Sequence, residues 1–255
     1  MTWLPDVLTY DLLAFCFAVT VCAGIVKGAV GFAMPLIMVV GMGMVLDPKL
    51  VVAGIILPTV LTNVMQIMRG GMETARQALR DFGLYIAIVC VMIFITAQFV
   101  TVIPTQVMYL VLGIPVTLLC AMQLAGFRLQ VGPDKHRIAS VIIGVISGVL
   151  GGLAGTWGPT TVLYLVALDT PKARQIAVQG VVYGIGAIVL LFGHLNSGIL
   201  SRETIPFSVF LLLPAILGIR IGFMLHDRID QATFRKLTLF VLLIAGLNLI
   251  RRGLI

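Results

Sequence analysis

The segment Gly24–Pro35, GIVKGAVGFAMP, has a close relative at Gly148–Pro159, GVLGGLAGTWGP. At one constant offset of 124 residues, 148 minus 24, Gly24, Gly28, Gly31 and Pro35 correspond to Gly148, Gly152, Gly155 and Pro159. Both copies lie in long apolar runs, where glycine and proline weaken a helix and leave backbone polar groups without partners. Such breaks are tolerated at membrane depth only beside protein or a water-filled cavity. Two breaks at corresponding places in two halves therefore indicate the substrate site of a transporter.

The composition of the chain is that of a membrane protein. Of its 255 residues, 60% are hydrophobic and 11% are charged, with a mean hydropathy of +1.14, whereas a soluble domain carries about 25% charged residues. The net charge of +7 comes from short Lys and Arg clusters between apolar runs, which is typical of cytoplasmic loops and not of a nucleic-acid surface. We therefore expect an all-α polytopic membrane protein that binds no nucleic acid.

Ten apolar runs follow one another along the chain, five in each half. They cover residues 8–26, 32–46, 50–68, 82–102, 106–125, 138–153, 159–168, 175–195, 205–225 and 234–250. The turn Asp-Pro-Lys at 47–49 follows the first motif, and Asp-Thr-Pro-Lys at 169–172 follows the second. A duplicated unit explains this pattern. It predicts a first transmembrane repeat at residues 1–127 and a second at 128–255, within one integral membrane domain.

The runs at 32–46 and 159–168 are shorter than the roughly 20 residues of a helical crossing. Each predicts either one arm of a re-entrant hairpin or a tilted, distorted span. If every run crosses the bilayer, five crossings per half invert the second repeat. If the short runs turn back, four crossings per half keep the repeats parallel.

The distribution of Lys and Arg favours the inverted arrangement with both termini outside, because cytoplasmic loops are enriched in these residues. That arrangement places eleven of them in the cytoplasm and four outside, against nine and six for parallel repeats. The eleven are Arg69, Arg76, Arg80, Arg128, Lys135, Arg137, Lys172, Arg174, Arg228, Arg235 and Lys236, and the four are Lys49, Arg202, Arg251 and Arg252.

Lys27 lies inside the first motif, at or near the break between two apolar runs. A charged side chain deep in a bilayer costs several kcal/mol, about 2.5 or more, so its presence predicts a cation that faces an anionic solute. The alternative is a lysine that extends from a helix end to the membrane surface. Gly28 and Gly31 of the same motif are candidates to line this site, although small residues in membrane helices also permit close helix packing.

The second motif offers hydrogen-bond donors in place of a charge. Gly155, Thr156, Trp157 and Thr160 lie around an expected helix start, where unpaired N–H groups and the helix dipole favour an oxyanion. Polar residues of the following runs are the next candidates, with the alternative that they only bond a neighbouring helix. Asn63, Gln179 and Tyr183 are expected to bind substrate, and Thr59, Thr62, Gln66 and Arg220 are secondary candidates, Arg220 with the alternative of an interfacial arginine.

Several chemistries have no counterpart in the sequence. There is no HExxH motif and no GxxxxGK[ST] loop, so neither a zinc protease nor a nucleotide-driven machine is expected. Asp47 and Asp169 lie between apolar runs next to prolines or threonine and are expected to be helix caps or turn residues rather than proton relays. We therefore expect no enzyme activity, no catalytic residue, no cofactor and no metal.

The duplicated motif, the end of each half and the stretch PAILGIRIGFMLHDRIDQATFRKLTLFVLLIAGLNLI at Pro214–Ile250 together resemble the sulfite exporter TauE/SafE family. The resemblance covers nearly the whole chain. It implies a multi-pass secondary carrier of the bacterial inner membrane that exports small anions such as sulfite, sulfonates or organosulfur acids. The first motif departs from the family pattern, because Phe32, Ala33 and Met34 stand where several consecutive glycines are usual.

Three functional hypotheses follow. The first is an anion carrier that works by alternating access between its two repeats, with a small anionic solute and the lipid bilayer as partners. The others are a passive anion channel and a membrane enzyme or assembly factor. A homodimer is left open. The first hypothesis predicts that the two breaks approach each other near the middle of the membrane.

Overall fold

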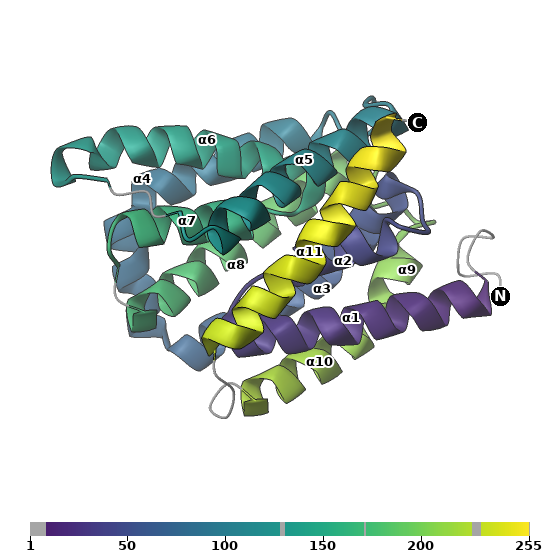
Figure 1. Cartoon of the computed structure of the whole chain (residues 1–255), viewed down its shortest axis with the longest axis horizontal. Helices are drawn as coiled ribbons and strands as arrows, with labels where there is room; N and C mark the ends of the chain where they lie inside the picture. Colours follow the sequence, from purple (N-terminus) through teal and green to yellow (C-terminus); the bar gives the residue numbers. More distant parts are fainter. Residues whose placement is uncertain (1–8, 128–130, 171, 226–230, 255) are drawn as a thin grey trace.

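The structure is a computed structural model that describes residues 9–127, 131–170, 172–225 and 231–254, and every regular element in these ranges is a helix (Figure 1). The helices are α1 (Tyr10–Val30), α2 (Met34–Met42), α3 (Pro48–Gly70), α4 (Met72–Ala97), α5 (Thr105–Leu124), η1 (Pro133–Lys135), α6 (His136–Ala154), α7 (Gly158–Ala167), α8 (Lys172–Asn196), α9 (Ile205–Phe210), α10 (Leu212–Leu225) and α11 (Gln231–Leu254). Each of the ten apolar runs coincides with helix over most of its length. Arg128 and Arg228 lie outside the described residues.

Six helical segments of the described chain are long and apolar enough to cross a membrane. They lie in α1, α3, α4, α6 and α8 and in the combined stretch of α9 and α10. This confirms the expectation of an all-helical, multi-pass membrane protein. Helix α4 begins ten residues before the apolar run at 82–102, because its polar first part, Met72–Asp81, is also helical and bends at Phe82 (φ −115°, ψ 15°).

Both glycine motifs end one helix and begin another. Helix α1 ends where Gly31 adopts a left-handed conformation (φ 86°) and its N–H caps the carbonyl of Lys27 at 2.7 Å. Gly155 (φ 63°) ends α6 in the same way, and its N–H donates a hydrogen bond to the carbonyl of Gly151. A left-handed residue ends a helix at low cost when it is glycine. The predicted breaks are therefore present at both motifs.

The short helix after each break runs back along the helix before it. In the second pair, Ser147 near the end of α6 donates to Thr160 of α7 (2.7 Å), and Ser140 near the start of α6 lies 2.6 Å from the hydroxyl of Tyr164. In the first pair, a Cβ on Gly41 of α2 would lie 2.8 Å from Val19 in the middle of α1. Each pair thus forms an antiparallel hairpin.

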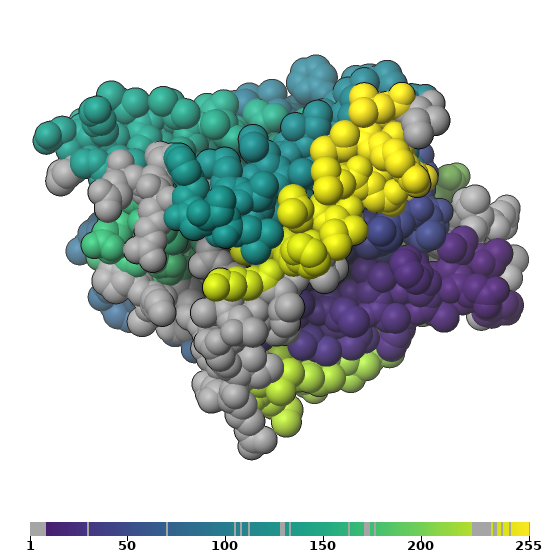
Figure 2. Space-filling model, in the orientation of Figure 1, coloured from purple at the N-terminus to yellow at the C-terminus, as the bar shows by residue number. Residues whose placement is uncertain are grey.

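The long helices pair across the two halves of the chain. Helix α1 packs on α10, α4 packs on both α6 and α8, α3 packs on α8, and α5 packs on α11. Figure 2 shows α5 and α11 side by side on one face of the molecule, with α1 next to α11. Because the main contacts join the halves, the chain forms one helical body rather than two.

The bundle has two distinct ends. At the terminal end, where α1 begins and α11 ends (Figure 1), Lys49 donates to the carbonyl of Thr101 at 2.8 Å and Asn196 donates to Gln98 at 2.7 Å. The opposite end, called the arginine end below, holds Arg69 at the end of α3. Its guanidinium lies 4.4 Å from the ring centroid of Phe223 at the end of α10.

Glycines bring α1 and α10 into backbone contact. A Cβ on Gly28 would lie 2.5 Å from the carbonyl oxygen of Ile219 and 2.7 Å from the Cα of Gly222. A Cβ on Gly24 would lie 3.0 Å from the Cα of Gly218. The spacing of four residues on both helices is the small-residue pattern that lets membrane helices approach closely. The packing alternative therefore holds for Gly28, although this residue also borders a cavity described below.

Candidate functional site

The two helix breaks meet at one cavity in the interior of the bundle. Its lining residues are Lys27, Phe32, Ala33, Pro35, Leu36, Thr59, Asn63, Gly155, Thr156, Trp157, Gly158, Pro159 and Tyr183. They come from both motifs and from α3 and α8, the helices that follow the two hairpins. The volume of this cavity is about 20 Å³, enough for one water molecule. We call this space the inner cavity.

Lys27 is the basic residue of the inner cavity, and only 2% of it is exposed. Its Nζ donates to Oδ1 of Asn63 on α3 and lies 5.9 Å from the ring centroid of Tyr183 on α8. The amide of Asn63 in turn donates to the backbone carbonyl of Tyr183 at 3.0 Å. Lys27 therefore does not extend to the membrane surface, and its partners are uncharged.

The second break faces Lys27 across the inner cavity. Tyr183 donates to the carbonyl of Gly158, the first residue of α7, at 3.0 Å, and its ring meets the indole of Trp157 edge to face at 6.4 Å. Thr156 precedes the helix start and is also buried. The free N–H groups of a helix start next to a cation are suited to an anion.

A network of hydroxyl groups joins α7 to α4 and α6. Tyr85 of α4 lies 2.9 Å from Ser147 and 2.9 Å from Thr161, and Ser147 donates to Thr160. Thr160 donates to the carbonyl of Trp157 at 2.8 Å. This network holds α7 against α4 and α6. Sequence reasoning did not identify Tyr85, Ser147 or Thr161, and the available signal was only that each is polar within an apolar run.

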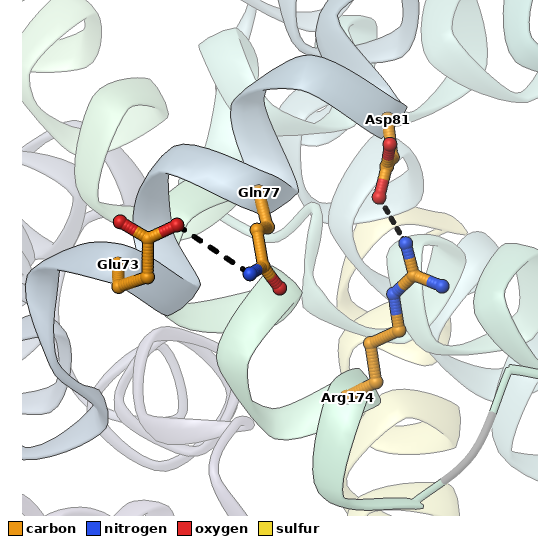
Figure 3. A network of polar contacts seen from close by, with 4 residues as sticks. All are labelled: Glu73, Gln77, Asp81 and Arg174. Atoms are coloured by element: carbon orange, nitrogen blue, oxygen red, sulfur yellow. Dashed lines mark hydrogen bonds and ion pairs between the residues drawn. The ribbon is translucent and has the colours of Figure 1, made fainter.

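A larger vestibule of about 560 Å³ opens at the arginine end. It is lined by Gly28, Gly31, Gln66, Ile67, Arg69, Gly71, Thr74, Ala75, Gln77, Arg174, Ala177, Val181 and Phe223. On its rim, Arg174 forms an ion pair with Asp81, and Glu73 accepts from Gln77 at 3.5 Å (Figure 3). The vestibule reaches Gly31, four residues beyond Lys27 in the chain. Two cavities thus adjoin the end of α1, one on each side of the first break.

Two glutamines lie where the vestibule meets the first break. Gln66 is 7% exposed and Gln179 is 4% exposed. A Cβ on Gly31 would lie 3.2 Å from Oε1 of Gln179 and 3.6 Å from Nε2 of Gln66. Among the described residues, Nε2 and Oε1 of Gln66 and Oε1 of Gln179 have no hydrogen-bond partner.

Most of the sequence candidates therefore gather around the first break. Thr160 is the exception in the second motif, because it lies in the hydroxyl network. Thr62 is buried and donates to the carbonyl of Pro58, one turn earlier in α3, at 2.7 Å, and its hydroxyl lies 3.5 Å from the sulfur of Met34 on the neighbouring helix α2. Arg220 is exposed on α10 and lies outside both cavities, as expected of an interfacial arginine.

The site has the chemistry of solute binding. Among the residues that the structure describes, no group of three or more His, Cys, Asp or Glu side chains could hold a metal ion. The inner cavity combines one ammonium group, amide and hydroxyl groups, and the indole of Trp157, whose Nε1 has no partner among the described residues.

Comparison with known proteins adds the family. Searches of curated proteins and of solved structures found no match to the chain. A scan against protein families matched residues 16–249 to the family described as sulfite exporter TauE/SafE. The match includes both glycine motifs, all residues of the inner cavity and most of α11. The chain therefore belongs to the sulfite exporter TauE/SafE family.

Proposed function

We propose that this protein is a secondary carrier that exports small anions, such as sulfite, sulfonates or organosulfur acids, by alternating access at the inner cavity. Membership of the TauE/SafE family implies a membrane transporter of such anions. The observation that carries the proposal is the meeting of the two breaks around Lys27. A buried cation with neutral partners attracts an anion far more strongly than it would in water.

The proposed site residues act together on the anion. Lys27 supplies the charge, and Asn63 orients its ammonium group. Trp157, through the Nε1 that has no partner among the described residues, and Thr156 offer donors from the second break beside Gly155, and Tyr183 closes the cavity between the halves. Gly31 borders the entrance from the vestibule.

The helix pairing supports two inverted repeats with re-entrant hairpins at residues 1–127 and 128–255. A two-fold axis that exchanges the halves would match α1 with α6 and α10 with α4, so the contact between α1 and α10 corresponds to the contact between α6 and α4. The same exchange maps the contact between α3 and α8 onto itself, and likewise the contact between α5 and α11. Because each hairpin returns to the end at which it began, it adds no net crossing, although α1 and α6 are each long enough to span a membrane. Three further crossings remain per half, by α3, α4 and α5 and by α8, α9 with α10, and α11, so the second half is inverted. A count of four crossings per half includes the first arm of each hairpin but not the arm that returns.

The two ends differ in charge, which orients the protein in a bacterial inner membrane. The described cations of the arginine end include Arg69, Arg76, Arg80, Lys135, Arg137 and Arg174, whereas Lys49, Arg202, Arg251 and Arg252 lie at the terminal end. The positive-inside rule places the arginine end, with its vestibule, in the cytoplasm. In this conformation an anion from the cytoplasm reaches Gly31 but not the terminal end, which is the arrangement of an exporter open to the inside.

Cysteine labelling tests this orientation. In a variant without native cysteines, Gln77→Cys in the vestibule should react with a membrane-impermeant maleimide only in inside-out vesicles. Arg202→Cys, which is exposed beyond α8 at the terminal end, should react only in intact cells. Labelling of both positions from the same side would contradict the three crossings between them.

The small size of the inner cavity favours a carrier over a passive channel. Its free space holds about one water molecule, so an oxyanion cannot pass without movement of the surrounding helices. Gly155 is closed in by Ile55 and Leu190, since a Cβ on it would lie 2.7 Å and 3.6 Å from their side chains. Opening toward the terminal end requires these contacts to separate.

The test is flux in proteoliposomes with purified protein. Sulfite and a series of small sulfonates should enter or leave with saturable kinetics, and unlabelled anion on the opposite side should accelerate exchange of labelled anion. Flux that rises linearly with concentration and shows no exchange would identify a channel. Absence of flux for every anion would contradict a transport role.

Replacement of Asn63 by aspartate tests the charge of the site. In Asn63→Asp, a carboxylate would stand where the amide oxygen now accepts from Lys27, and the resulting ion pair would cancel the attraction for a solute anion. We expect the affinity for transported anion to fall about tenfold or more, because a charge-assisted hydrogen bond contributes about 1.5–3 kcal/mol. Asn63→Gln keeps the amide and should retain part of the affinity. Equal affinities of Asn63→Asp and wild type would remove Lys27 from the anion site.

A further inference from the structure

Three helices each contribute to two polar layers at the first break. The inner layer consists of Lys27 on α1, Asn63 on α3 and Tyr183 on α8. The outer layer consists of Gly31, which caps the end of α1, Gln66 on α3 and Gln179 on α8. Their separations in sequence are four, three and four residues, so each pair lies about one helical turn, roughly 5 Å, apart.

The directions of the helices place the outer layer consistently on the vestibule side. Helices α1 and α3 run toward the arginine end, and Gly31 and Gln66 come after Lys27 and Asn63. Helix α8 runs away from that end, and Gln179 comes before Tyr183. Gly31 and Gln66 line the vestibule, whereas Lys27, Asn63 and Tyr183 line the inner cavity.

The outer layer carries hydrogen-bonding capacity that the described residues do not use. Both side chains are more than nine-tenths buried, and Nε2 and Oε1 of Gln66 and Oε1 of Gln179 have no partner there. Gly31 has no side chain between them, and a Cβ at this position would lie against both amides. A buried polar group without a partner is costly, and such a group in a native structure requires an explanation.

We propose that the outer layer binds a hydroxyl group of the transported anion, so that the preferred substrate is a small hydroxylated sulfonate rather than sulfite itself. This inference rests on the proposed function. The acidic group lies at Lys27, and the hydroxyl, about one helical turn away, donates to an amide oxygen and accepts from Nε2 of Gln66. A second carboxylate fits this layer less well, because it cannot donate to Oε1 of Gln66 or Gln179.

The expected selectivity follows from the desolvation of these amides. A site built to hydrogen-bond a substrate hydroxyl rejects an analogue that lacks it, because binding of the analogue leaves buried polar groups unpaired. An analogue of the same size that carries a methyl group in place of the hydroxyl should therefore have a kcat/KM lower by about tenfold or more.

The test compares 2-hydroxyethanesulfonate with ethanesulfonate and propanesulfonate, which match it in charge and approximate size. We expect wild-type protein in proteoliposomes to prefer the hydroxylated anion by at least about tenfold in kcat/KM. In Gln66→Leu and Gln179→Leu, the preference should shrink toward unity while ethanesulfonate flux is kept or increased. Retained ethanesulfonate flux also shows that each variant is folded. Thr62→Val, which alters a buried hydroxyl outside both cavities, serves as the matched control and should retain the preference.

Equal transport of the two sulfonates by wild type would overturn this inference and leave the proposed function intact. A preference that survives in both glutamine variants would likewise overturn it, because other groups would then recognise the hydroxyl. If both leucine variants lose all flux, the comparison is repeated with Gln66→Asn and Gln179→Asn, which keep the amide group on a side chain one methylene shorter. If these variants transport both sulfonates equally, the inference stands, and if they keep the wild-type preference, it fails. Flux of neither sulfite nor any sulfonate by wild type would overturn the proposed function and this inference with it.

Discussion

Replacing Lys27 by methionine should strongly weaken anion flux with little change in the stability of the protein. The ammonium group is 2% exposed, and its described hydrogen-bond partner is the uncharged Asn63. A bond to a charged group contributes about 1.5–3 kcal/mol, which corresponds to a loss of about tenfold to more than a hundredfold in anion affinity. Methionine has a similar volume and removes the desolvation cost of a buried ammonium, and this gain offsets the loss of the donor to Oδ1 of Asn63.

Two measurements on one preparation check this prediction. At concentrations below the wild-type KM, flux of sulfite and of ethanesulfonate should fall by about tenfold or more, while the thermal midpoint in detergent should stay close to that of wild type. Lys49→Met is the matched control, since Lys49 lies at the terminal end and donates to the carbonyl of Thr101. Its flux should stay within about twofold of wild type, because surface interactions of this kind contribute little. Unchanged flux in Lys27→Met would contradict the anion site.

A single methyl group on Gly28 should destabilise the bundle. An alanine Cβ there would lie 2.5 Å from the carbonyl oxygen of Ile219 and 2.7 Å from the Cα of Gly222, both of which are backbone atoms that cannot rotate away. Helices α1 and α10 must then separate along their glycine contact. Overpacking of this kind costs about 1–3 kcal/mol, and Gly222→Ala should have a similar effect from the other side.

Gly83→Ala is the control with the opposite expected sign. Gly83 lies in α4, and no heavy atom lies within 4 Å of a Cβ built on it. Alanine is favoured over glycine in a helix by about 0.8–1 kcal/mol, so this variant should unfold at a higher temperature than wild type. Thermal unfolding in detergent measures all three variants. Equal midpoints for Gly28→Ala and Gly83→Ala would show that α1 and α10 are not in backbone contact.

The sequence allowed the helices and the breaks to be predicted because both depend on local chemistry. Apolar runs specify membrane helices, and Gly31 and Gly155 permit the left-handed conformation that ends α1 and α6. Lys27 was identifiable for a similar reason, since a charge in an apolar run is unusual wherever the run lies. These inferences required no knowledge of which helices are neighbours.

What the sequence did not reveal depends on contacts between distant segments. Nothing local to Gly28 indicates that its neighbour is Gly222 rather than a ligand, and both interpretations were open until α10 was placed beside α1. Tyr85 and Ser147 form one network across α4 and α6 although 62 residues separate them. The direction of α2 and α7 was equally undetermined, because a short apolar helix has the same composition whether it returns or continues.

The neutral surroundings of Lys27 have a consequence for the voltage dependence of transport. With a monovalent anion bound, the site carries no net charge, and after release it carries one positive charge. The resetting of an empty exporter from outside-facing to inside-facing then moves positive charge inward through part of the field. An inside-negative potential favours that movement by up to about 2.3 kcal/mol per 100 mV. Membrane potential would thus accelerate the return of the empty protein rather than the outward step.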